Sequence, residues 1–406
     1  MPDVKVNYDE HKVPRYELPS ALVGGDGRPI NSARKWMSSQ RKRVFKLFED
    51  EMYGVIPGRP DEISFELMSC KNNALGGLGI RKEIRIHCKM ADHRTHCLDL
   101  LLYLPKNITP PIATFLGLNF MGNHTVTDEP DIVISPVWQR HHPGAEILRG
   151  VQKHRWQLVE VLKRGYASAT MYYYDIFPDH PSGFKESIYS LFYTEAELLA
   201  PDKAFGAIGA WAWGLSRGLD CLEAETTVNP RRVVVHGHSR LGKASLLAGA
   251  ADERFAAVIS NDSGCGGSAL TRRCFGESLA AIQARFPHWF RTNFRKYIDH
   301  EQDLPFDQHM LFALLAPRPA YAASASEDLW ADPKGEFLAI ANADEVYKLF
   351  GSNGLGTKEM PRPSQSICSD LGYHIRIGKH DVQLEDWVLF MNFIDKHFKD
   401  KKYNRC

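Results

Sequence analysis

The sequence predicts a strand that turns at a serine into a helix in the stretch Val233-Val234-Val235-His236-Gly237-His238-Ser239-Arg240-Leu241-Gly242-Lys243. A glycine two residues before the serine lets the strand and helix backbones approach, and the turn holds the hydroxyl at the carboxyl end of the strand. This is the outline of a nucleophile elbow, so Ser239 is our candidate nucleophile. The usual pattern, G-x-S-x-G, places glycine at position 241, whereas this chain has Leu241 there and Gly242 next. An ordinary strand–turn–helix connection is the alternative interpretation.

Apolar runs that alternate with helical patterns extend the same arrangement along the chain. The runs that we expect to form buried strands are 112–118, 167–171, 232–236, 256–261 and 319–325, and the helical stretches are 204–223, 242–251, 334–349 and 384–397. Such alternation indicates a parallel, doubly wound sheet. Upstream runs at 63–69, 80–88 and 97–104 predict antiparallel strands that open the sheet. The predicted fold class is α/β, an α/β-hydrolase fold: a three-layer αβα sandwich with a mostly parallel central sheet and an N-terminal extension.

The beginning of the chain differs from the rest. A loop rich in Pro and Gly precedes a helical pattern over 32–53, which ends before Gly54-Val55-Ile56-Pro57-Gly58. We interpret residues 1–60 as an N-terminal extension that packs on the core and residues 61–406 as the catalytic domain. The sequence contains no convincing linker, repeat or low-complexity tract, so we predict a single domain overall.

Charge and cysteine content exclude several classes of protein. The 406 residues contain 50 Lys and Arg against 49 Asp and Glu, which gives no electrostatic reason to expect nucleic acid or an anionic membrane as partner. No run has the length of a transmembrane helix, and the first residues lack the pattern of a signal peptide. The eight cysteines include no C-x-x-C pair, so we expect mostly buried reduced thiols, with a pairing of Cys88 and Cys97 as the alternative.

A serine nucleophile needs a base and a carboxylate that orients the base. In α/β-hydrolases the histidine lies between the last strand and the last helix, and His380 occupies that loop here. Two carboxylates follow predicted strands. Asp262 begins the turn-rich loop after the strand that follows the elbow, and Asp328 lies just beyond the strand at 319–325. Chain order alone favours Asp328, although an aspartate there can also serve as a helix N-terminal charge.

The developing oxyanion needs hydrogen-bond donors. The loop 117–124, after the first buried parallel strand, occupies the position where lipases and esterases keep donor groups. The backbone N–H of Arg240 is a further candidate donor, because this residue follows the nucleophile. Its guanidinium adds a permanent positive charge beside the serine, and a surface salt bridge is the alternative role for it.

Several blocks of the sequence resemble the glucuronoyl esterases of carbohydrate esterase family 15, of the bacterial type. The similarity extends over nearly the whole chain. The matching blocks are 8–14, 53–54, 115–126, 237–243, 262–267, 273–278, 286–290 and 330–337. The elbow of that family has the pattern G-x-S-R-x-G, in which Leu241 occupies the second variable position and Gly242 the last glycine.

The resemblance implies roles for individual residues. Ser239 is the nucleophile, His380 the base, and Arg240 stabilises the oxyanion through its guanidinium as well as its backbone. Many family members have a glutamate at the position of Asp262, and some bacterial members have an acid at the position of Asp328. Aspartate is one methylene shorter than glutamate, yet we rank Asp262 slightly ahead and keep Asp328 as the alternative acid.

The resemblance also implies substrate contacts and a reaction. Lys243, Glu277 and Trp330 would hold hydroxyls of a glucuronoyl ring, since they offer a donor, an acceptor and an apolar face with one N–H. The expected reaction is hydrolysis of (4-O-methyl-)glucuronoyl esters, as in the lignin–carbohydrate links of glucuronoxylan, with no metal and no cofactor.

We expect a monomer that is secreted or periplasmic, although the chain shows no signal peptide and a cytoplasmic location stays open. Two alternatives remain at this point. One is an acetylxylan esterase, in which Lys243, Glu277 and Trp330 would have no obvious role. The other is an inactive carbohydrate-binding protein on a hydrolase scaffold.

Overall fold

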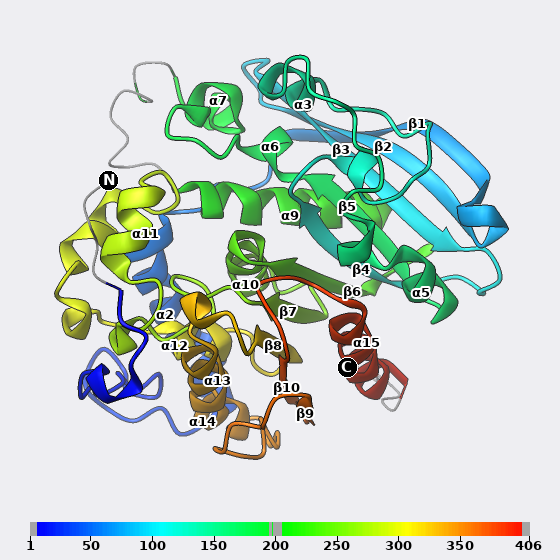
Figure 1. The fold of residues 1–406 in the computed structure, drawn as a ribbon. Coiled ribbons are helices and arrows are strands. Elements are labelled where there is room, and N and C mark those ends of the chain that lie inside the picture. Colours follow the sequence, from blue (N-terminus) through cyan, green and yellow to red (C-terminus); the bar gives the residue numbers. More distant parts are fainter. Residues whose placement is uncertain (1–5, 195–196, 198–204, 400–406) are drawn as a thin grey trace.

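A computed structural model describes residues 6–194, 197 and 205–399, and in this part of the chain ten strands form one sheet (Figure 1). Their order across the sheet is β1-β2-β3-β5-β4-β6-β7-β8-β10-β9. The strands are β1 (Glu62–Ala74), β2 (Gly79–Lys89), β3 (Thr95–Pro105), β4 (Ile112–Asn119), β5 (Ala167–Tyr172), β6 (Val228–His238), β7 (Ala257–Asn261), β8 (Ala320–Ala325), β9 (Gln365–Cys368) and β10 (Leu371–Arg376). The run from β5 to β10 is parallel, while β1–β3 and β9 pair antiparallel at the two edges.

Helices cover both faces of this sheet. They are α1 (Ala33–Lys35), α2 (Arg41–Phe48), α3 (Pro136–His141), α4 (Lys153–Trp156), α5 (Leu158–Lys163), α6 (Tyr173–Ile176), α7 (Tyr189–Phe192), α9 (Ala207–Ala224), α10 (Arg240–Ala251), α11 (Leu279–Arg285), α12 (Gln308–Ala313), α13 (Pro333–Asn342), α14 (Asp344–Lys348) and α15 (Leu384–Lys399). Helices α9, α10 and α13 lie on one face, and α5 and α15 lie on the other (Figure 1). The predicted three-layer α/β architecture with a mostly parallel sheet is confirmed.

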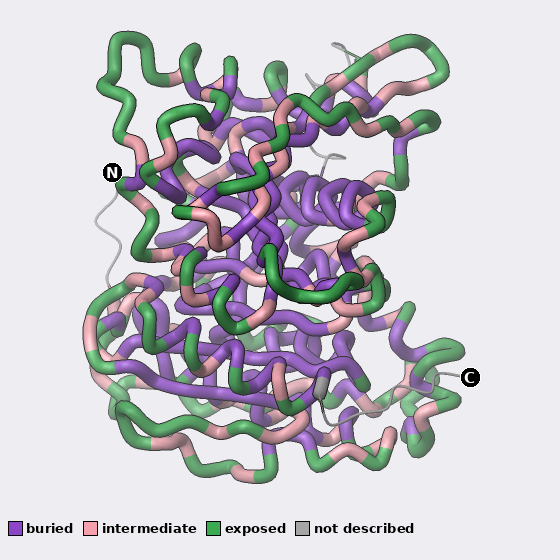
Figure 2. The backbone as a smooth tube through the Cα atoms, turned by 90° about the vertical axis from the view of Figure 1, so that its right-hand side faces the viewer, coloured by how far each residue is buried: buried purple, intermediate pink, exposed green. Residues whose placement is uncertain are grey.

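Alternate side chains of the central strands fill the two layers between sheet and helices. On β6, Val233 and Val235 belong to the core beneath α9 and α10, whereas Val234 packs in the cluster that contains Trp387 and Phe390 of α15. A strand that is covered on both faces has no polar side, which is why the sequence shows continuous apolar runs there. Figure 2 shows the result, with buried backbone through the interior and exposed segments at the periphery.

The predicted strands and helices agree with the structure in type, with differences at boundaries. Sequence reasoning missed β9 and β10, whose stretch follows a long loop rich in Pro, Gly and Ser. The helical pattern at 334–349 divides into α13 and α14 at Ala343, and the expected first residue of the helix at 204–223 lies outside the described residues.

The segment before β1 packs on the hydrolase core. Trp36, Val44 and Phe48 are fully buried, and the Arg41 guanidinium donates to the carbonyl of Ala250 at 2.6 Å. These contacts fit an extension that covers the core, and the division of the chain at residue 60 stays a prediction.

Cys88 and Cys97 do not pair. Cys88 lies opposite His96 in the β2–β3 register, and Cys97 lies opposite His87, so the two thiols point to opposite faces of the sheet. All cysteines within the described residues are free thiols. In that same part of the chain, no helix combines the length and apolar character needed to span a bilayer.

Candidate active site

Ser239 lies in the strained turn that the sequence predicts between β6 and α10. Its backbone has φ 57° and ψ −131°, a conformation that is costly for a residue with a side chain. Gly237 is required, because a Cβ atom there would lie 2.1 Å from the carbonyl oxygen of Leu241. Leu241 itself is buried in the core, and the close approach next to it is made by Gly242, where a Cβ atom would lie 2.9 Å from the Ser263 side chain. The structure therefore places the second glycine one position later than the usual motif.

A cleft of about 360 Å³ opens at the carboxyl ends of the parallel strands, beside this turn. Every site residue that the sequence nominates lines it: Ser239, Arg240, Lys243, Asp262, Glu277, Asp328, Trp330 and His380. They come from five separate segments of the chain, so the fold brings together residues up to 141 positions apart. The remaining lining residues are Ser263, Gly264, Arg285, Phe286, Trp289 and Ala331.

His380 lies in the loop between β10 and α15, and its ring pairs with a carboxylate. Its Nδ1 is 2.6 Å from Oδ2 of Asp328, so the Nδ1–H donates and Nε2 is the ring nitrogen left for proton transfer. The Asp328 side chain is 5% exposed and that of His380 is 40% exposed. A buried carboxylate that holds a half-exposed imidazole is the arrangement that a serine hydrolase needs.

Asp262 lies in the same cleft, but its carboxylate has no hydrogen-bond partner. Its side chain is fully buried and neither carboxylate oxygen has a hydrogen-bond partner. The Arg376 guanidinium lies 3.8 Å from its Oδ2, and Nδ1 of His238, an imidazole whose pKa burial lowers well below its usual range, lies 4.0 Å away. Burial raises the pKa of Asp262 well above its usual range, and the negative charges of Glu336 and Asp328 raise it further.

The two acids therefore differ in what they offer to His380. The structure gives the hydrogen bond to Asp328, the residue that the family resemblance ranked second, and leaves Asp262 close by without one. Ligand-type atoms of His380, Asp328 and Asp262 all lie within 4.8 Å of one another, a spacing at which a metal ion can be held. The hydrogen bond between His380 and Asp328 already engages two of those groups, and our expectation of no metal stays a prediction.

Arg240 points into the cleft from the first turn of α10. Its Nη1 donates to Oδ2 of Asp179, and its guanidinium carbon lies 4.8 Å from the ring centre of Trp289 and 5.1 Å from that of Phe286. Its Nε is buried without a hydrogen-bond partner. One side of the guanidinium is thus fixed while donor capacity remains beside Ser239.

Lys243, Glu277 and Trp330 form one wall of the cleft. The Lys243 ammonium donates to the carbonyl oxygen of Ser263 at 2.6 Å and to that of Cys265, and lies 3.8 Å from the Glu277 carboxylate. Burial lowers the pKa of Lys243 and raises the pKa of Glu277. The charge of each residue partly offsets the pKa shift of the other. The backbone N–H of Glu277 donates to the carbonyl of Trp330 at 2.8 Å, which ties the three residues together.

The sequence suggests oxyanion donors in the loop 117–124, and this stays a prediction. Within the described chain none of its residues lines the cleft, and Asn119 instead closes the loop by accepting from the N–H of Gly122 at 2.7 Å. The sequence also missed Arg285, Phe286, Trp289 and Asp179. Phe286 and Trp289 belong to a block that resembles the family, which was the available signal, whereas Asp179 stands in no motif and only the fold reveals it.

Comparisons with known proteins agree on one family. The family model described as "Glucuronyl esterase, fungi" matches residues 158–351. The chain is 45% identical over 400 residues to carbohydrate esterase MZ0003 from an unknown prokaryotic organism, covering 96% of this chain and 92% of that protein. It is 35% identical to 4-O-methyl-glucuronoyl methylesterase 1 of Phanerochaete chrysosporium, over 82% of this chain and 62% of that protein. The solved glucuronoyl esterase from Solibacter usitatus superposes with a TM-score of 0.90 at 44% identity, covering 96% of this chain and all of that one.

Proposed function

The chain belongs to the glucuronoyl esterases of carbohydrate esterase family 15, and from this premise we propose that it hydrolyses (4-O-methyl-)glucuronoyl esters through Ser239, His380 and Asp328. One observation carries the proposal. The strained serine, the paired histidine and aspartate, and the wall of Lys243, Glu277 and Trp330 all line a single cleft. The enzyme is a carboxylic ester hydrolase of the α/β-hydrolase fold.

In the first half of the reaction, Nε2 of His380 takes the proton of the Ser239 hydroxyl as its oxygen attacks the uronoyl carbonyl. The negative charge that forms on the carbonyl oxygen is stabilised by the Arg240 guanidinium and the backbone N–H of Arg240, which as the first N–H of a helix has no partner within that helix. The imidazolium then protonates the leaving alkoxide as the ester C–O bond breaks. Water, deprotonated by the same imidazole, attacks the acyl carbonyl. The bond between the acyl carbon and Oγ of Ser239 then breaks as the imidazolium returns a proton to Oγ, which releases the uronic acid.

Asp328 orients His380 and stabilises the imidazolium charge. Its carboxylate holds the Nδ1–H, which fixes the tautomer in which Nε2 accepts a proton. Asp262 stands in a poorer environment for this role, because burial and neighbouring carboxylates favour its protonated, neutral form. We therefore place Asp328 first and Asp262 second, the reverse of the order drawn from the resemblance.

Substrate selection follows from the wall that Lys243, Glu277 and Trp330 form. Two of the three ammonium donors of Lys243 are used by backbone carbonyls, which leaves one direction for Glu277 or a sugar hydroxyl. Glu277 accepts, and the Trp330 indole offers an apolar face to the ring. The partner is glucuronoxylan or a lignin–carbohydrate ester. A monomeric enzyme that acts outside the cytoplasm fits such a polymer, and both properties are part of the proposal.

The test measures hydrolysis of benzyl glucuronate against 4-nitrophenyl acetate by the wild type and by Ser239→Ala. We expect strong turnover of the glucuronate ester and loss of roughly 10⁶-fold in kcat in the variant, as when a catalytic serine is removed. Activity confined to the acetate ester would favour a carbohydrate deacetylase. Activity on neither ester, together with no labelling of Ser239 by a fluorophosphonate, would indicate a binding protein.

A further inference from the structure

Asp179 lies in the loop after α6 and points toward the Arg240 guanidinium from outside the cleft. Its side chain is 2% exposed. Oδ2 accepts from Nη1 of Arg240, while Oδ1 accepts from Nε2 of His288 at 2.8 Å and from the indole N–H of Trp289 at 2.7 Å. One carboxylate thus joins three segments that are far apart in the sequence: the loop after α6, the start of α10, and the segment after α11.

Two aromatic rings confine the Arg240 side chain on its other sides. Phe286 and Trp289 stack on each other with ring centres 3.8 Å apart and planes 3° apart, and the guanidinium carbon lies about 5 Å from both rings. An arginine has many rotamers, and a long side chain that is already held in one of them need not be ordered during the reaction. In this arrangement the Nε–H of Arg240 is buried and has no hydrogen-bond partner.

We propose that Asp179 is a positioning residue that holds the Arg240 guanidinium in place for the oxyanion and acts on the reaction only through Arg240. This inference rests on the proposed function of Arg240 in the same cleft. His288 and Trp289 serve it in turn, because their N–H groups fix the carboxylate that fixes the guanidinium. Preorganised donors of this kind are effective because they do not reorient when charge develops.

Asp179 carries a negative charge at neutral pH. Burial raises its pKa, but the hydrogen bond from His288 and the charge of Arg240 outweigh burial and leave the pKa below its ordinary value. Asp179→Asn therefore removes a negative charge and one acceptor oxygen while it keeps the size of the side chain.

A double-mutant cycle tests the coupling. Wild type, Asp179→Asn, Arg240→Met and the double variant are compared in kcat and KM on benzyl glucuronate. We expect Asp179→Asn to lower kcat by about 10- to 100-fold with KM within about twofold, since small misplacement of a catalytic group has effects of this size. In the Arg240→Met background the same substitution should change kcat by less than about twofold, because the residue through which Asp179 acts is gone.

Asp220→Asn is the matched control. Asp220 is another fully buried carboxylate that binds arginines, with Arg217 and Arg254 each at 2.7 Å. It lies near the end of α9, just before β6 begins, whereas Ser239 follows the carboxyl end of β6, so the two residues lie at opposite ends of that strand. This variant should lower the midpoint of thermal unfolding and leave kcat within about twofold. If Asp179→Asn does not fold, Trp289→Phe replaces it, since this change removes one hydrogen bond to Asp179 and keeps a ring beside Arg240.

Two results would overturn the inference: an unchanged kcat in Asp179→Asn, or an equal loss of kcat in the presence and absence of Arg240. The rate of Ser239 labelling by a fluorophosphonate gives a second readout of the cycle, since it also develops charge on an oxygen beside Ser239. If the wild type fails to hydrolyse benzyl glucuronate while labelling shows the coupling, the proposed substrate is wrong and the role of Asp179 stands.

Discussion

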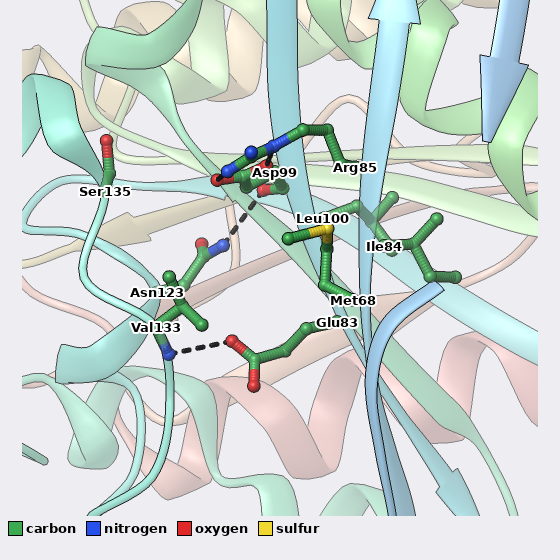
Figure 3. A pocket seen from close by; sticks show the side chains of 9 residues that line it. All are labelled: Met68, Glu83, Ile84, Arg85, Asp99, Leu100, Asn123, Val133 and Ser135. Carbon is green, nitrogen blue, oxygen red and sulfur yellow. Dashed lines mark hydrogen bonds and ion pairs between the residues drawn. The ribbon is translucent and has the colours of Figure 1, made fainter. Parts of the chain in front are cut away.

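The cleft at Ser239 and the pocket between β1–β3 and the loop 123–135 (Figure 3) both contain charged side chains, but they pair them differently. In the pocket, Arg85 donates two hydrogen bonds to Asp99 at 2.8 and 2.9 Å, and Glu83 accepts from the N–H of Val133 at 2.8 Å. In the cleft, both oxygens of Asp262 lack partners. Buried polar groups are nearly always paired, so the two regions differ in how far their carboxylates are compensated.

The two acids of the cleft give the largest expected effect. Asp328→Asn should lower kcat on benzyl glucuronate by roughly 10³- to 10⁴-fold, because the amide favours the wrong tautomer of His380. Asp262→Asn keeps the hydrogen bond between Asp328 and His380 and should cost about tenfold, as expected for a nearby group outside the proton relay. Steady-state kinetics of the two isosteric variants decide between them, and the reverse order would restore Asp262 as the triad acid.

Glu277 sharpens the contrast between binding and chemistry within the cleft. Glu277→Gln weakens one acceptor to a sugar hydroxyl and should lower kcat/KM on benzyl glucuronate by about tenfold, the size of one hydrogen bond to a charged group. Turnover of 4-nitrophenyl acetate, which has no sugar hydroxyl, should stay within about twofold. Equal losses on both esters would show that Glu277 supports the scaffold and does not contact the substrate.

The same contrast explains what the sequence predicts and what it does not. The elbow, His380 and the candidate acids follow from local patterns, since a serine between a strand and a helix, or a histidine before the last helix, is visible in the chain itself. The choice between Asp262 and Asp328 depends on which carboxylate lies within hydrogen-bonding distance of His380 and on burial, which no local pattern records. Asp179 lies in no motif, and its contact with Arg240 exists only once the loop after α6 and the start of α10 have folded together.

Asp99 in the pocket of Figure 3 should matter for stability and not for catalysis. Asp99→Asn removes one charge of a paired, partly exposed site, and we expect a loss of about 1 kcal/mol in the free energy of unfolding. Because no residue of this pocket lines the cleft, kcat should remain within about twofold. Urea denaturation and steady-state kinetics check the two halves of the prediction. A large fall in kcat at full stability would mean that the two regions are coupled.

Asp175, beside this pocket, gives a test by pH. Its carboxyl accepts from the Ser135 hydroxyl at 2.5 Å, and burial raises its pKa from an ordinary 3.8 to about 8. Between about pH 4 and 8 the folded protein therefore binds a proton at Asp175 that the unfolded chain has released, so the stability contributed by this group falls as the pH rises.

Asp175→Asn has no proton to lose at this position, so the stability difference between wild type and variant should shift in favour of the variant from pH 5 to pH 8. Urea denaturation at pH 5, 6.5 and 8 measures this shift. Ser135→Ala, which removes the hydroxyl but keeps the carboxyl, is the matched control and should retain the pH dependence of the wild type. A difference between wild type and Asp175→Asn that is constant with pH would mean that Asp175 is already ionised in the folded protein.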